Sequence, residues 1–112
     1  MKKTKLGEFE EMVLLAVIVL KDDAYGVEIK KELETRLSER LSVGSIQSAL
    51  KRMEEKGFLN SQFGESTKKR GGKRKRIYTA TAHAHKVLHE IKEIREGFWS
   101  NIQPASIDLK TI

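Results

Sequence analysis

Residues 58–80 read FLNSQFGESTKKRGGKRKRIYTA, and this segment decides the fold prediction. Its two ends, residues 58–63 and 76–80, are rich in the aromatic and β-branched residues that favour paired strands. The connection between them is about ten residues long, which exceeds the usual hairpin loop, and long loops in compact domains are typically functional or mobile. The segment therefore predicts a β-hairpin with a long tip.

The positive charge of the chain is concentrated in this hairpin. The formal net charge is +6, and positions 68–76 hold seven basic residues and no acidic one. They are Lys68, Lys69, Arg70, Lys73, Arg74, Lys75 and Arg76. Removing these seven charges leaves the rest of the chain at −1. A localised basic segment is typical of a docking patch for a polyanion, although a solvated loop gives the same pattern when it occurs alone. The Gly71-Gly72 pair favours the docking patch, because it lets the backbone lie close to a surface.

Three helices are predicted before the hairpin, because apolar residues recur at helical spacing over residues 8–20, 24–37 and 43–56. Asp23 and Ser42 are expected to cap the second and third helices, and Gly57 is expected to end the third. The first helix is apolar on nearly every face. It must therefore be covered both by its own domain and by a partner.

A fourth helix is predicted over residues 81–102, since the residue before a proline disfavours helical geometry and Pro104 follows. Its apolar residues Ala84, Val87, Ile91, Ile94 and Phe98 alternate spacings of three and four, the pattern of heptad positions a and d. Part of this stripe has no core of its own to bury against. Dimerisation is therefore expected through Val87, Ile91, Ile94 and Phe98, with residues 105–112 as a frayed tail.

The order helix, helix, helix, hairpin is that of the winged helix-turn-helix. The predicted fold class is mainly α with a small β-hairpin: a winged-helix DNA-binding domain over residues 1–80, then a C-terminal dimerisation helix and short tail over residues 81–112. In this fold the third helix enters the major groove of DNA. With Ile46 and Leu50 pointing inward, its outward face carries six candidate DNA contacts: Gly44, Ser45, Gln47, Ser48, Lys51 and Arg52. An ordinary amphipathic helix explains this pattern equally well, and only the neighbouring hairpin favours DNA.

Composition excludes several other classes of protein. The chain has no cysteine, which excludes disulfides and thiolate metal sites and fits a reducing compartment. The longest apolar run, residues 12–20, is about half of what a membrane-spanning helix needs. Acidic residues before that run and charged residues after it do not fit a signal peptide. A cytoplasmic protein without a membrane partner is expected.

Four runs of sequence resemble the PadR family of transcriptional regulators over residues 6–99. They are YGVEI at 25–29, SVGSI at 42–46, ALKRMEEKG at 49–57 and GGKRKRIY at 71–78. The chain departs from the family in two places. It has Gln47 where the family usually has tyrosine, and ATAHA at 80–84 where the family has Leu-Thr-Glu-x-Gly.

The resemblance implies a cytoplasmic homodimer, usually a repressor. In such dimers the C-terminal helix pairs with its partner and packs near the other subunit's first helix. The length of this chain matches the members that have one C-terminal helix. Some multidrug-sensing relatives also place a tryptophan near the end of that helix to stack flat apolar ligands between subunits. Phe98 and Trp99 are the candidate effector contacts here, although we favour the simpler interpretation that both rings fill the interface.

No catalytic or metal site is predicted. His85 and His89 lie four residues apart on one helix face, but no cysteine completes a metal site, and surface histidines are the favoured interpretation. Neither imidazole has a nucleophile or carboxylate arranged around it, so neither catalysis nor a cofactor is expected.

The predicted function is a sequence-specific, double-stranded DNA-binding regulator that acts as a homodimer and is a repressor. Whether a small aromatic or hydrophobic effector releases it from DNA is left open by the sequence. The alternative is a winged-helix protein-interaction or architectural module without a specific operator. RNA binding is the weaker third choice, because no aromatic residue interrupts residues 68–76 to stack on unpaired bases.

Overall fold

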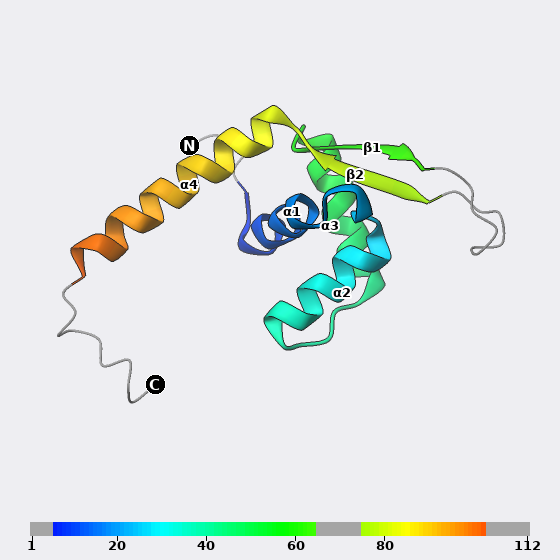
Figure 1. Ribbon diagram of the computed structural model, residues 1–112, viewed down its shortest axis with the longest axis horizontal. Coiled ribbons are helices and arrows are strands. Elements are labelled where there is room, and N and C mark those ends of the chain that lie inside the picture. Colours follow the sequence, from blue (N-terminus) through cyan, green and yellow to red (C-terminus); the bar gives the residue numbers. More distant parts are fainter. Residues whose placement is uncertain (1–5, 65–74, 103–112) are drawn as a thin grey trace.

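A computed structural model of the protein describes residues 6–64 and 75–102. The elements in chain order are α1 (Glu8–Leu20), the short 3-10 helix η1 (Lys21–Asp23), α2 (Gly26–Leu37), α3 (Val43–Glu55), β1 (Leu59–Phe63), β2 (Arg76–Ala80) and α4 (Ala82–Asn101). In Figure 1, α1, α2 and α3 gather below the two strands, and α4 runs away from this group on the opposite side from β1 and β2. The prediction of a mainly helical fold with a small hairpin and a long C-terminal helix is confirmed.

The start of α2 differs from the prediction. Asp23 belongs to η1 instead of capping α2, which begins after Tyr25 and has no side-chain cap. The cause is a contact with the hairpin: Tyr25 forms an isolated β-bridge with Ile77, and the Tyr78 N–H donates to the Ala24 carbonyl at 3.0 Å. Because β2 holds Tyr25 in extended geometry, the helix cannot start at residue 24.

The hydrophobic core lies where the first three helices meet the hairpin. Its fully buried large side chains are Phe58, Leu14, Ile29, Ile46, Leu50, Met53, Leu59, Val13 and Val17. Phe58 precedes β1, and its ring stacks on His83 of α4 with centroids 4.9 Å apart. This contact anchors the start of α4 on the winged-helix body.

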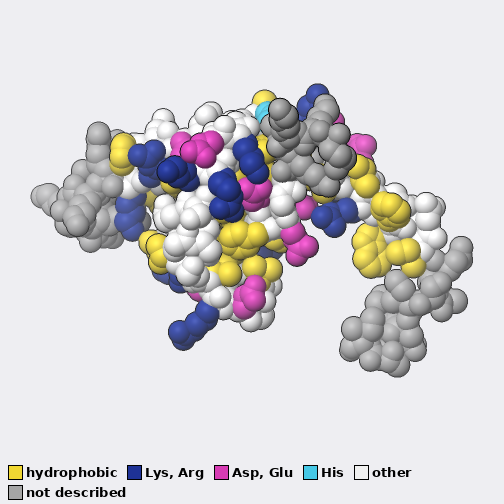
Figure 2. Space-filling model, turned by 180° about the vertical axis from the view of Figure 1, so that it is seen from behind, with side chains coloured by type: hydrophobic (Ala, Val, Ile, Leu, Met, Phe, Trp, Pro, Cys, Tyr) yellow, Lys and Arg dark blue, Asp and Glu magenta, His cyan; other side chains and the backbone are white. Residues whose placement is uncertain are grey.

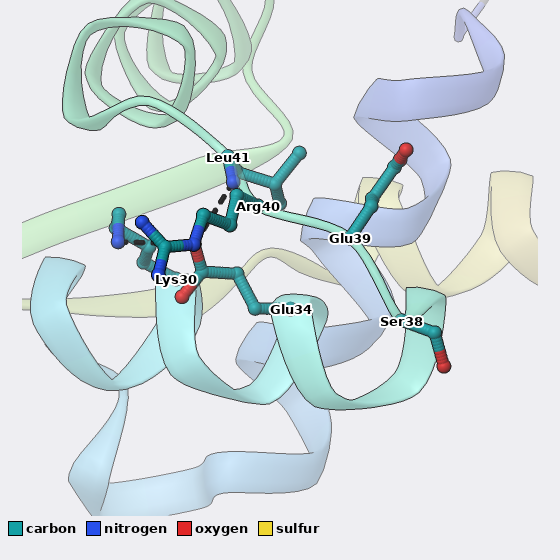
Figure 3. A pocket seen from close by; sticks show the side chains of 6 residues that line it. All are labelled: Lys30, Glu34, Ser38, Glu39, Arg40 and Leu41. Carbon is teal, nitrogen blue, oxygen red and sulfur yellow. Dashed lines mark hydrogen bonds and ion pairs between the residues drawn. The ribbon is translucent and has the colours of Figure 1, made fainter.

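The turn between α2 and α3 is held by Glu34. Its carboxylate accepts the Leu41 N–H at 2.8 Å and pairs with Lys30 Nζ at 3.1 Å (Figure 3). The hydrogen bond from Leu41 and the contact with Lys30 lower the pKa of Glu34. Ser42 then caps α3, with its Oγ accepting the Ser45 N–H at 3.0 Å, as predicted. These bonds fix how α3 leaves the turn.

The hairpin is antiparallel, with Leu59 opposite Ala80 and Phe63 opposite Arg76. Gly57 ends α3 with φ +83°, the left-handed geometry expected for a glycine at this position. At the far end of the strands the Gly64 N–H donates to the Lys75 carbonyl at 2.7 Å. Predictions for residues 65–74 and for the tail at 105–112 fall outside the described residues.

A search of the described part of the chain for a helix both long and apolar enough to cross a membrane found none.

Candidate nucleic-acid interface

The polar face of α3 has the orientation that its sequence predicts. The four core positions Ile46, Ala49, Leu50 and Met53 are buried, and the six candidate DNA contacts are exposed: Gly44, Ser45, Gln47, Ser48, Lys51 and Arg52. The Ser45 hydroxyl donates to the Ser42 carbonyl at 2.9 Å, which leaves its oxygen free to accept. The helix therefore offers a continuous polar surface, and contact of these six residues with DNA stays a prediction.

A groove of about 370 Å³ joins this surface to β2 of the hairpin. Gln47, Ser48, Lys51 and Glu54 line it from α3, and Arg76 and Tyr78 line it from β2. The outward side of α3 and the first half of β2 thus share one face. A winged helix that reads the major groove and contacts the flanking backbone needs this arrangement.

Arg76 is held at the edge of that groove by a short chain of hydrogen bonds. Its Nη1 donates to Ser61 Oγ at 3.0 Å, and the Ser61 hydroxyl donates to Glu54 Oε2 at 2.6 Å. The guanidinium carbon also lies 4.7 Å from the centre of the Phe63 ring. The side chain is exposed yet ordered by two kinds of contact, which reduces the entropy that it would lose on meeting a phosphate.

Tyr78 of β2 also lines this groove. Burial raises the pKa of its phenol, and the neighbouring Glu54 carboxylate raises it further, while Arg76 opposes both. Tyr78 therefore stays neutral at physiological pH and keeps its hydroxyl proton.

Gln47 lies against the start of α2. A Cβ built on Gly26 would lie 2.9 Å from Gln47 Nε2, so the glycine is what leaves room for this amide. This packing could not be predicted from sequence patterns, because the two residues are far apart in the chain. The position where the resembled family has tyrosine is here filled by an amide that rests on α2.

Arg52 differs from Lys51, the other charged residue of the α3 face, because its charge is paired with a buried carboxylate. Its Nε lies 3.1 Å from Oε2 of Glu10, and Lys56 Nζ lies 3.0 Å from Oε1 of the same carboxylate. Glu10 is 6% exposed and also accepts the Gly7 N–H at 3.0 Å. Burial would raise the pKa of Glu10, but the hydrogen bonds from Gly7, Lys56 and Arg52 outweigh burial and lower it. Arg52 thus joins α3 to α1 in this structure.

Two of the seven basic hairpin residues, Lys75 and Arg76, belong to the described part of the chain. Lys75 is half-buried at the end of the hairpin, and Arg76 is exposed. The other five, Lys68, Lys69, Arg70, Lys73 and Arg74, lie outside the described residues. Figure 2 shows lysine and arginine side chains on the end of the molecule that carries the hairpin.

The predicted dimerisation stripe of α4 divides into two parts. Near the start of the helix, Ala84 is buried and Val87 and Ile91 pack partly on the core of their own chain. Further along, Ile94 is 62% exposed and Phe98 71% exposed. Figure 2 shows apolar side chains gathered at this far end of α4.

Leu88 is a core residue that the heptad assignment missed. It follows Ala84 by one turn and faces α1, so the buried face of α4 is rotated from the predicted stripe near its start. Thr81 caps the helix, as its sequence suggests: it accepts the Ala84 N–H at 3.1 Å and donates to the Gly57 carbonyl at 2.8 Å.

A second groove of about 370 Å³ runs between α1 and α4. Leu15, Ile18 and Leu88 supply apolar walls, with His85 and His89 at the edge. Arg95 Nη2 bonds to Glu11 Oε1 at 3.1 Å and ties the two helices together, and His89 Nε2 lies 3.2 Å from Glu93 Oε1. Among the described residues, no three side chains of the metal-ligating types form a cluster.

Comparison with known proteins gives the family directly. The family model described as "Transcriptional regulator PadR-like family" matches residues 14–90, more than half of the chain. A PadR family transcription regulator from Clostridium difficile is 34% identical over 80% of this chain and 90% of its own, with a TM-score of 0.57. The comparison with curated proteins gave no match.

Two further solved structures support the fold. A PadR-like transcription factor from Bacteroides fragilis has a TM-score of 0.67 at 20% identity and covers 82% of this chain and 84% of its own. A PadR-like transcriptional regulator from Bacillus cereus has a TM-score of 0.65 at 23% identity and covers the same shares of the two chains. With the winged-helix body, the α3 surface and the long α4 in place, the family match leads to one conclusion: the chain belongs to the PadR-like family of transcriptional regulators.

Proposed function

We propose that this regulator is a homodimeric repressor that binds a specific double-stranded operator in the cytoplasm. Residues 1–80 bind DNA, and residues 81–112 dimerise. The observation that carries the proposal is the shared face of α3 and β2, on which Gln47, Ser48, Lys51 and Arg76 line one groove. Amides and hydroxyls are suited to base edges, and basic side chains to phosphates and guanine.

The proposed division of labour follows from the chemistry of the two elements. Gln47 and Ser48 of α3 read bases, with Lys51 reaching either a base or a phosphate. The basic hairpin, of which Arg76 is an ordered member, supplies phosphate contacts and hence affinity that weakens steeply with salt. We assign Arg52 a smaller part than the sequence suggested, because its charge is already paired with Glu10.

Exposed apolar side chains support the proposed dimer. Ile94, Phe98 and Trp99 are each more than 60% exposed near the end of α4, and Leu15 and Val19 are exposed on α1. Large apolar side chains grouped on a protruding helix are typical of an interface between subunits. A second copy of the chain covers both helices in the proposed dimer.

The proposed contacts for an effector that releases DNA are the two rings near the end of α4. Phe98 and Trp99 supply aromatic surface at the proposed interface, and two interpretations remain open, filling of that interface by the rings or stacking of a flat apolar ligand between them. Titration with a panel of planar hydrophobic compounds distinguishes them. A sensor gives quenching of Trp99 fluorescence together with release of DNA, and a purely structural pair gives neither.

Selection of duplex fragments from a random library tests the proposed function. A dimeric regulator selects a pseudo-palindrome whose half-sites are about 10 base pairs apart or a multiple of that distance. Equal affinity for every duplex makes the protein an architectural binder. No affinity for any duplex, in a sample that is folded by circular dichroism, makes it a protein-interaction module.

A further inference from the structure

Two valines stand exposed beside the proposed base-reading surface and have no role in the core. Val43, the first residue of α3, is 63% exposed, and Val27, in the first turn of α2, is 50% exposed. Both line one hollow of about 230 Å³ together with Gly26 and Gln47. The hollow is therefore continuous with the polar face of α3.

Folding does not explain either valine. The buried residues of α2 are Ile29 and Leu33, and α3 packs through a different set of side chains from Val43. Valine is also a weaker helix former than many residues, because its branched Cβ restricts the side chain in a helix. At an exposed position of a helix, a lysine, glutamate or alanine would stabilise the helix more than valine does.

The surroundings of the two valines fit nucleic acid. Lys30 and Lys31 line the same hollow, and they follow Val27 by three and four residues, which places them one turn along the same side of α2. The Lys31 side chain is 69% exposed. Lys30 is less exposed, at 29%, and pairs with Glu34, so Lys31 is the lysine that is open to solvent. Apolar groups beside an exposed lysine match a major groove, in which phosphates flank the base edges.

Only one base presents an apolar group in the major groove. Thymine carries a C5 methyl there, whereas the other three bases present hydrogen-bonding groups or a bare C–H. Gly44, next to Val43, has no side chain to hold the helix away from the bases. Gln47 lies one turn after Val43, so a base pair beside the one that meets Gln47 is within reach of the valine.

We propose that Val43, with Val27 beside it, recognises thymine through its C5 methyl group and so contributes to the choice of operator. This inference rests on the proposed function, because it assigns one specificity contact within the same DNA-binding surface. Isolated exposed valines are common on protein surfaces and need no explanation; the pair in one hollow, next to the base-reading residues, is what distinguishes these two.

Deoxyuridine substitution tests the proposal by removing the methyl group alone. A duplex selected by the full-length protein is synthesised again with each thymine replaced in turn by deoxyuridine, and the dissociation constants are measured by fluorescence anisotropy. For the wild-type protein, we expect one thymine in each half-site at which deoxyuridine weakens binding about fourfold, the effect of one buried carbon.

Val43→Ala supplies the other half of a double-mutant cycle. It leaves the core untouched, and its sensitivity to deoxyuridine at that thymine should fall below about twofold, the usual limit of non-coupled effects. Leu37→Ala, which removes a 37% exposed leucine from the end of α2, is the control and should keep the fourfold sensitivity. The readout is the thymine to deoxyuridine ratio, so a general change in affinity or assembly does not imitate it.

Three results overturn the inference: selected half-sites without an invariant thymine, no sensitivity to deoxyuridine in the wild-type protein, or unchanged sensitivity in Val43→Ala. Each of these leaves sequence-specific binding, and hence the proposed function, intact. Equal affinity for all duplexes overturns both, and the selection step reveals it before any deoxyuridine is used.

Discussion

At the scale of single residues, Glu10 connects the N-terminal helix to the helix that is proposed to read DNA. Its carboxylate is 6% exposed and has three donors: the Gly7 N–H, Arg52 and Lys56. A buried carboxylate is stable only when its hydrogen-bonding capacity is filled. The two cations come from successive turns of α3, so Glu10 holds that helix along its C-terminal half.

Replacing Glu10 by glutamine should therefore destabilise the protein by about 1.5–3 kcal/mol at neutral pH, the usual range for hydrogen bonds to a charged group. Because the folded-state pKa of Glu10 is lowered, its ionised form contributes stability above the unfolded value of 4.5 and loses that contribution as pH falls through the folded pKa. The difference between wild type and Glu10→Gln should thus shrink in acid. Urea unfolding at several pH values, at one protein concentration, measures it.

Glu8→Gln is the control for that experiment. Glu8 lies in the same first turn of α1 but is exposed, and no ion pair to it is found among the described residues. The Glu8→Gln substitution should lower the free energy of unfolding by only a few tenths of a kcal/mol, the scale of a helix-dipole effect. Equal losses from Glu8→Gln and Glu10→Gln would show that Glu10 has no special structural role.

At the scale of elements, the end of α3 determines where the hairpin begins. Gly57 has φ +83°, and the chain then passes directly into Phe58 and β1. A Cβ at Gly57 would meet nothing within 4 Å, so any cost of adding one is conformational and not steric. Gly97 of α4 is equally open, but it lies inside a helix and has no positive φ.

Alanine at these two glycines should change stability in opposite directions. Gly57→Ala should destabilise by about 1–2 kcal/mol, the cost of left-handed geometry for an L-residue. Gly97→Ala should stabilise by about 0.5–1 kcal/mol, because glycine is costly inside a helix. Thermal unfolding of both variants at equal concentration measures the two shifts. Shifts of the same sign would contradict the assignment of the α3 end.

Element boundaries were predictable wherever a local signal decides them. Ser42 and Thr81 cap their helices, Gly57 ends α3, and the strand at 76–80 has the bounds that its residues suggested. Asp23 failed as a cap because pairing of Tyr25 with Ile77 overrides the local preference. That pairing joins residues 52 positions apart, and periodicity carries no information on such contacts.

The sequence predicted which side of α3 is exposed at the candidate site, but it did not predict the ion pairs within that site. Helical spacing gave the exposed side of α3 correctly, since burial of Ile46 and Leu50 fixes the remaining directions. The partner of Arg52 could not be predicted, because Glu10 is 42 residues away in sequence. A charge placed on an exposed face can still turn toward a buried acid, and only the packing of α1 on α3 brings the two together.

At the scale of the whole molecule, the proposed dimer depends on the far half of α4. Ile91 packs partly on the core of its own chain, so a charge there would disturb folding as well as assembly. Ile94 is 62% exposed and serves as the cleaner test. A stable dimer typically buries about 800 Å² of surface on each subunit. In the proposed dimer the exposed side chain of Ile94 is part of that buried surface.

Ile94→Glu should therefore give a folded monomer with much weaker affinity for duplex DNA, since both half-sites are no longer bound together. Sedimentation velocity and circular dichroism measure assembly and folding separately. Lys86→Glu, an exposed position of the same helix outside the apolar stripe, should remain dimeric. An intact dimer in Ile94→Glu would refute the proposed interface.

The central claim is that α3 and the hairpin bind duplex DNA through a surface that includes Lys51, and the salt dependence of binding tests it most directly. The dissociation constant for a selected duplex is measured over a range of salt concentrations for wild type, Lys51→Gln and the control Lys86→Gln. We predict a steep dependence of the logarithm of affinity on the logarithm of salt concentration for wild type and the same slope for Lys86→Gln. The slope for Lys51→Gln should be smaller by about one unit if Lys51 contacts a phosphate.

If Lys51 contacts a base instead, the slope stays nearly unchanged. Lys51→Gln then loses about 1–3 kcal/mol of discrimination between the correct and the wrong base at one position. Binding that does not depend on salt, or a Lys51→Gln protein identical to wild type in slope, affinity and sequence preference, would contradict the account.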